Sequence, residues 1–86
     1  MKIKDCFFLK EIAGIYTVIS VNGDSDFDGM LTLNHTGAFL WSLLVTGASK
    51  QELIEALVKE YEIDSLLAEK DTNDFLNKLN SIDVFE

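Results

Sequence analysis

The sequence predicts an α+β fold in which a three-stranded antiparallel sheet is followed by three helices. Three observations predict it: β-branched and aromatic residues gather in the first third of the chain, two helix-capping patterns follow, and apolar residues then recur at helical spacing. The chain has 86 residues, enough for one domain, and 48% of them are hydrophobic, as in chains that bury a core. We therefore expect one domain over residues 1–86.

The strands are expected in the first 33 residues. Residues 7–12 form a short apolar run, Ala13-Gly14 supplies a tight turn, and residues 15–21 are rich in β-branched and aromatic side chains. Residues 22–29 have the Asn, Gly, Asp and Ser content of a loop, and residues 30–33 are expected to form the third strand. Consecutive strands with short connections favour antiparallel pairing.

Three helices are expected after the strands. Asn34 is a good N-cap, and the helix after it is apolar over most of its surface, which indicates a place between other elements. Ser49 and Glu52 have the spacing of a capping box, which opens an amphipathic second helix. The third helix is expected from about Asp64 to Asn80, with an inward side marked by Leu67, Phe75, Leu79 and Ile82.

Charge and composition argue against nucleic-acid and membrane partners. The net charge is −8, and all seven basic residues are Lys, whereas affinity for nucleic acid comes mainly from Lys and Arg at phosphates. No apolar run approaches the roughly 20 residues that span a bilayer. A single Cys, and Asp5 interrupting the apolar start, indicate a cytoplasmic protein that is not exported.

The loop between the second and third strands resembles the beginning of a calcium-binding loop. Asp24, Asp26 and Asp28 occupy its first, third and fifth positions, and Gly29 the sixth. The twelfth position holds His35 in place of the bidentate Glu, and the flanking segments are strand-like. A solvated acidic hairpin loop is therefore the favoured interpretation, and no metal site is assigned.

Asp64-Ser65-Leu66 matches the tripeptide at which acyl carrier proteins bear phosphopantetheine. A carrier, however, is a helical bundle with its Ser near mid-chain, whereas here the first third of the chain is strand-like. Asp64 as a helix N-cap explains the same residues. No cofactor is therefore expected.

Residues typical of enzyme active sites are scarce. Cys6 and His35 are the only residues of their kinds, and the sequence places one at an N-terminal strand and the other at a helix start. A nucleophilic Cys needs a neighbouring base and an orienting group, and a Cys/His metal site needs more ligands than these two. We expect no catalytic residues and no enzyme activity.

Asp71 lies four residues after Leu67 and four before Phe75, on or beside the inward stripe of the last helix. Two interpretations are open: Asp71 caps a second helical segment that starts near Thr72, or it binds something across that face.

The segment Leu33-Asn34-x-Thr36-Gly37-Ala38-x-x-Trp41 and the later Asp71-x-x-x-Phe75-Leu76-x-x-Leu79 resemble motifs of the PqqD-like family. Its members recognise ribosomally made (RiPP) precursor peptides and include coenzyme PQQ synthesis protein D. The resemblance covers nearly the whole chain. It departs from the family where Asp83 stands before Val84, a position at which members commonly have Gly.

The resemblance implies a winged helix-turn-helix-like fold that binds the leader segment of a precursor peptide as an added strand. The domain then presents the peptide to a modifying enzyme, typically a radical SAM protein, as in PQQ biosynthesis or a related pathway. The implied peptide-binding residues lie on the third strand and the last helix: Met30, Leu31, Thr32, Leu33, Leu67, Asp71, Phe75, Leu76, Lys78 and Leu79.

Two other functions remain as alternatives. An unpaired edge strand serves a protein–protein interaction or subunit module as readily as it serves a leader peptide. A winged helix also suggests a DNA-binding regulator, against which the absence of Arg and the acidic charge argue.

Overall fold

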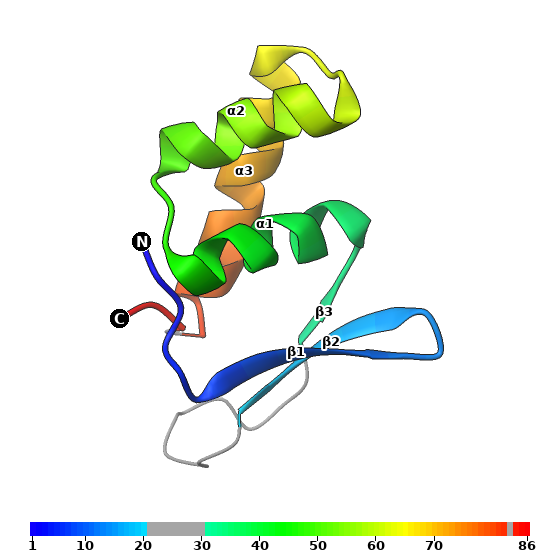
Figure 1. Cartoon of the computed structure of the whole chain (residues 1–86), viewed down its shortest axis with the longest axis vertical. Coiled ribbons are helices and arrows are strands. Elements are labelled where there is room, and N and C mark those ends of the chain that lie inside the picture. Colours follow the sequence, from blue (N-terminus) through cyan, green and yellow to red (C-terminus); the bar gives the residue numbers. More distant parts are fainter. Residues whose placement is uncertain (21–30, 83) are drawn as a thin grey trace.

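The computed structural model describes residues 1–20, 31–82 and 84–86. Its strands and helices follow the predicted order, with the sheet as one layer and the helices on one side of it (Figure 1). The strands pair in the order β1-β2-β3, and both pairs are antiparallel. The predicted α+β fold is confirmed. The elements are β1 (Phe7–Ile12), β2 (Ile15–Ser20), β3 (Leu31–Leu33), α1 (His35–Thr46), α2 (Lys50–Tyr61) and α3 (Ser65–Asn80).

The β1–β2 hairpin closes through the predicted Ala13-Gly14 turn. Both turn residues have positive φ, 53° for Ala13 and 80° for Gly14, which is the signature of a two-residue type I′ turn. In such a turn the flanking residues, here Ile12 and Ile15, form a hydrogen-bonded pair. This pair fixes which main-chain groups of every strand point toward a neighbour.

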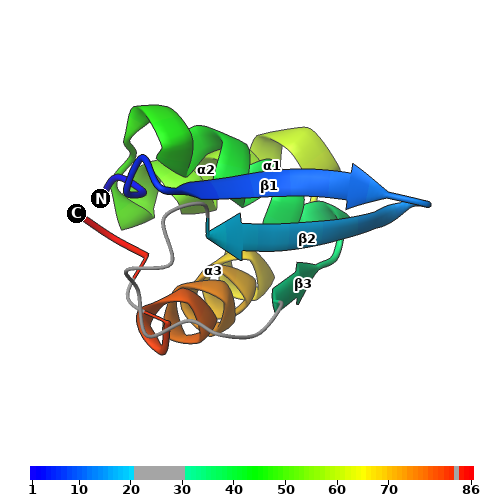
Figure 2. The same ribbon diagram turned by 90° about the horizontal axis from the view of Figure 1, so that it is seen from below.

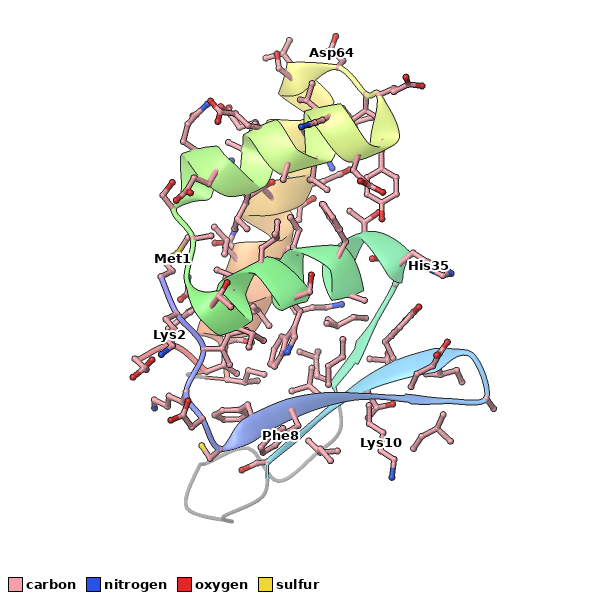
Figure 3. All side chains as sticks on the ribbon, in the orientation of Figure 1. Met1, Lys2, Phe8, Lys10, His35 and Asp64 are labelled. Atoms are coloured by element: carbon pink, nitrogen blue, oxygen red, sulfur yellow. The ribbon has the colours of Figure 1, made fainter. Side chains whose placement is uncertain are left out.

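The two faces of the sheet differ in burial. Phe7, Val18 and Leu33 point toward the helices and are at most 7% exposed. Phe8 and Ile12 point the other way and are about half exposed. Figure 3 shows Lys10, which shares their face by the alternation of a strand, directed away from the helices.

The core lies between the sheet and the three helices. The side chains of Leu40, Trp41 and Leu44 on α1 are fully or almost fully buried, as the apolar character of that helix predicted. Leu53 and Leu57 on α2 complete the layer above them. Gly37 and Ala38 are also buried, so the first turn of α1 lies close to its neighbours.

The predicted helix caps are confirmed. Asn34 accepts a hydrogen bond from the Gly37 amide at 2.8 Å, and Ser49 with Glu52 forms the full capping box. The hydrogen bonds from Ser49 hold the pKa of Glu52 below its usual value. Asp64 caps α3 by accepting from the Leu66 amide at 2.6 Å.

The structure excludes one of the two interpretations of Asp71 and contradicts the predicted position of Leu67 on α3. The helix runs unbroken through residue 71, so Asp71 does not cap a second segment. Leu67 is 47% exposed instead of facing inward. The buried residues at this end of α3 are Ala68 and Thr72 instead. They precede the buried Leu76 at intervals of four residues, so they share its face of the helix.

The two chain ends lie side by side (Figures 1 and 2). The Lys4 amide donates to the Val84 carbonyl at 2.8 Å, and the Glu86 amide donates to the Lys2 carbonyl at 2.9 Å. Val84 is fully buried. Within the described residues, every helix is too short or too polar to cross a membrane.

Candidate functional site

Thr32 presents its main-chain amide and carbonyl to an open edge of the sheet. Hydrogen-bonded pairs alternate along antiparallel strands, so the Ile12–Ile15 pair directs the main-chain groups of Tyr16 and Val18 toward β3. Their partners are Leu33 and Leu31. The intervening Thr17–Thr32 pair is not hydrogen-bonded, and the groups of Thr32 point outward.

A groove of about 770 Å³ lies along this edge, between β3, the start of α1 and one face of α3. Figure 2 shows β3 beside α3, with no other described element between the two. The walls of the groove come from four elements and the hairpin turn. The lining residues are Gly14, Ile15, Thr32, Leu33, Asn34, Thr36, Gly37, Leu40, Asp71, Asp74, Phe75 and Lys78.

The floor of the groove is apolar and rigidly held. Leu33 and Phe75 are 7% and 8% exposed, so each shows only a small part of its surface to the groove. Leu40 lies beneath them with no exposed surface. Gly37 completes the floor, and its lack of a side chain lets α1 approach both β3 and α3. Such a floor favours an apolar side chain as its occupant.

Charged side chains of α3 form the wall opposite β3. Asp71 is half-buried, whereas Asp74 and Lys78 are exposed. Asp74 is paired with Lys70 at 3.1 Å, one turn before it on the helix. Neither the carboxylate of Asp71 nor the ammonium of Lys78 has an ion pair or hydrogen bond with another described residue.

The structure brings together only part of the residue set that the sequence suggested. Thr32, Leu33, Asp71, Phe75 and Lys78 line the groove. Four other suggested residues do not line it, because Leu31 packs against the core, Leu67 is exposed, and Leu76 and Leu79 are buried in the core. Met30 lies outside the described residues.

Several lining residues were missed by the sequence reasoning. Gly14 and Ile15 reach the groove because the hairpin turn extends past β3, which no local pattern reveals. Gly37 carried a readable signal, since a Gly inside a helix is costly and indicates close packing. The sequence indicated Asp74 only as a charged residue on the surface of a helix and Asn34 only as a helix cap, and neither role points to the groove.

The remaining candidates from the sequence do not assemble into a second site. Cys6 precedes the start of β1. His35 packs edge-on against Tyr16, whose partner Glu11 lies near the end of β1, so Cys6 and His35 are at opposite ends of this strand. Ser65 begins α3 in an α+β fold, not in a carrier-type bundle. Among the described residues no group of three acidic, His or Cys side chains could hold a metal, and the Asp24–Asp28 segment lies outside them.

A second groove, of about 380 Å³, lies at the opposite edge of the sheet, between β1 and α1. Its lining includes Phe8, Leu9, Trp41 and Val45. By the same alternation, the main-chain groups of Leu9 and Glu11 point away from β2.

Comparison with known families matches the chain to the model described as coenzyme PQQ synthesis protein D (PqqD), over residues 19–84. The chain belongs to the PqqD family. The matched PqqD segment contains β3 and all three helices, and so every groove residue except Gly14 and Ile15. A search among curated proteins returned no match.

A solved structure shares the fold of this PqqD-family chain from end to end. It is TbiB1 in complex with the TbiA(beta) leader peptide, 28% identical in sequence with a TM-score of 0.78. The alignment covers 100% of this chain and 95% of the TbiB1 chain. That protein is therefore similar in its whole architecture, not only in the helices.

Proposed function

We propose that this protein binds the leader segment of a ribosomally synthesised precursor peptide as an added strand at β3. The observation that carries the proposal is the main-chain edge at Thr32, which lies directly beside a groove with an apolar floor. Membership of the PqqD family supports it, and so does the similarity to a protein whose solved structure contains a leader peptide.

Strand addition explains how one short strand contributes to binding. A peptide residue opposite Thr32 exchanges two hydrogen bonds with it, which satisfies the amide and the carbonyl that β2 leaves free. Side chains of the peptide alternate, so every second one faces the groove. An apolar side chain placed over Leu33 and Phe75 gains roughly 1.5–3 kcal/mol on full burial.

The bound peptide is then presented to a modifying enzyme, which we propose is of the radical SAM type. Binding at one edge of the sheet holds the leader and leaves the rest of the precursor free to enter another protein. In this role the domain acts as a cytoplasmic peptide chaperone over residues 1–86 and needs no catalytic residue of its own.

Titration tests the proposal. The labelled leader of a precursor encoded beside this protein's gene is titrated with the full chain, and fluorescence anisotropy is recorded. We expect saturable binding at micromolar concentrations or below, and weaker binding by Phe75→Ala. An anisotropy that does not saturate at micromolar protein concentrations would count against leader binding.

A second function is favoured by one observation, the groove at the β1 edge. Phe8 and Val45 line it and are about half exposed, so the groove presents apolar surface to a partner. A protein–protein interaction at this edge is the alternative function. Glu11→Pro removes an outward amide from β1, so it would weaken such an interaction and leave binding at β3 unchanged.

A further inference from the structure

We propose that the β3–α3 groove selects peptides that carry a Lys or Arg side chain close to an apolar one, and that Asp71 is the residue that reads the cation. This inference rests on the proposed function, because it concerns the peptide that enters the same groove. It adds a charge requirement that neither the strand edge nor the apolar floor imposes.

The state of Asp71 in the free protein favours a cationic ligand. Its carboxylate is half-buried in the groove wall and has no cation or hydrogen-bond donor among the described residues. A carboxylate held partly out of water gains more from a charged donor than an exposed one does, because solvent screens the interaction less. Asp71 is therefore placed to accept a hydrogen bond from a bound ligand.

The order of charges along the wall also favours a cation beside Asp71. Asp74, one turn after Asp71, is partly neutralised by Lys70, which leaves Asp71 as the carboxylate with no local counter-ion. Lys78 lies seven residues after Asp71, which is about 10 Å along the helix axis at 1.5 Å per residue. A basic peptide side chain is thus attracted at the Asp71 end of the groove and repelled at the Lys78 end.

The apolar floor lies at a distance from Asp71 that matches the spacing of side chains in an extended peptide. Phe75 is four residues after Asp71, so the two side chains lie on the same face of α3, about 6 Å apart along its axis. Alternate side chains of an extended peptide are separated by about 6.7 Å. A peptide can therefore place an apolar residue over Phe75 and a basic residue two positions away beside Asp71.

The test uses a library of random 12-residue peptides displayed on mRNA and selected against the immobilised full chain. From the selected pool, one peptide and its variants with each basic residue replaced by Glu are then synthesised and titrated. We expect Lys or Arg to be enriched at a fixed offset from an apolar residue. Replacement of that basic residue by Glu should weaken binding roughly 10- to 100-fold, as loss of a hydrogen bond between charged groups implies.

Variants of the protein assign the effect to Asp71. Asp71→Asn should weaken binding of the basic peptide several-fold, and Asp71→Lys should bind the Glu peptide better than the basic one. Glu69→Lys is the matched control, since it makes the same charge change on an exposed position of α3 outside the groove. Circular dichroism melts check that each variant is folded.

The outcomes separate the two proposals. The charge requirement would be overturned if the selected peptides bound wild type without enriched basic residues. It would also be overturned if Asp71→Lys and Glu69→Lys changed the affinity for the basic peptide equally, and in both cases leader binding would stand. Failure to select any peptide that binds saturably would overturn the proposed function and this inference with it.

Discussion

Gly37 and Phe75 meet at the floor of the β3–α3 groove, where a side chain on residue 37 would crowd its neighbours. A Cβ atom on Gly37 would lie 3.4 Å from Cε1 of Phe75, and 3.3 Å from both the Cβ of Leu33 and the Oδ1 of Asn34. Leu33 belongs to β3, Asn34 is the N-cap of α1, and Phe75 belongs to α3. One glycine therefore sets how closely the elements of the groove approach one another.

Gly37→Ala should weaken peptide binding while changing stability little. Alanine favours a helix interior over glycine by up to about 1 kcal/mol, and the tight contacts of its methyl group oppose that gain. The displaced Phe75 ring and Leu33 side chain alter the floor on which the peptide packs. Titration of the labelled leader and urea denaturation measure the two effects separately. Ser42→Ala, on the same helix but outside this groove, is the control, and equal affinities of the two variants would contradict the prediction.

Asn34→Ala should lower the free energy of unfolding by about 1 kcal/mol, because the Gly37 amide loses its side-chain acceptor. Asn34→Asp keeps an acceptor at the same position and should retain most of the stability. The midpoints of urea denaturation of the two variants give the comparison. An Asn34→Ala midpoint equal to that of wild type would show that the cap contributes nothing.

The capping box makes stability depend on pH. Hydrogen bonds from Ser49 lower the folded-state pKa of Glu52 below 4.5, its ordinary value. A lowered pKa means that the stabilisation is fully present above about pH 4.5 and is lost as the pH falls through the folded-state pKa. Wild type should therefore melt above Glu52→Gln at neutral pH, and this difference should shrink in acid. Glu55→Gln controls for the loss of one charge on the helix, and a difference that stayed constant with pH would exclude the mechanism.

Thr72→Val should stabilise the protein by about 1 kcal/mol. Thr72 is fully buried on α3, and its hydroxyl has no hydrogen-bond partner among the described residues. Valine has nearly the same shape and removes the unsatisfied group. Thr72→Ser keeps the hydroxyl and loses a methyl group, so it should be destabilising. Thermal melts that rank Val below wild type would indicate that the hydroxyl is satisfied in solution.

The fold could be predicted from the sequence because its signals are local. The caps at Asn34 and Ser49 and the Ala13-Gly14 turn each involve residues close together in the chain, and all three are confirmed. Leu67 was placed on the wrong side of α3 because Ala68 and Thr72, weakly apolar residues, carry the buried stripe there.

The groove could be predicted only in part, because it depends on contacts between distant segments. The resemblance placed Thr32, Leu33 and Phe75 at the groove, on the two elements that form its sides. The reach of the hairpin turn, with Gly14 and Ile15, follows from how far β2 extends beyond β3, and that register has no local signature. Which groups of Thr32 point outward likewise follows from the pairing of the whole sheet.

The central claim is that a peptide adds to the sheet at Thr32, and a pair of proline substitutions tests it most directly. Thr32→Pro removes an outward amide from β3, and Glu11→Pro removes one from β1. Both are exposed positions on edge strands, where proline is tolerated. The measurement is the affinity of each folded variant for the labelled leader peptide. Strand addition at β3 predicts that Thr32→Pro binds about 10-fold more weakly than wild type, as loss of one main-chain hydrogen bond implies, and that Glu11→Pro binds as wild type does. Unchanged affinity of Thr32→Pro, or equal losses in both variants, would contradict it.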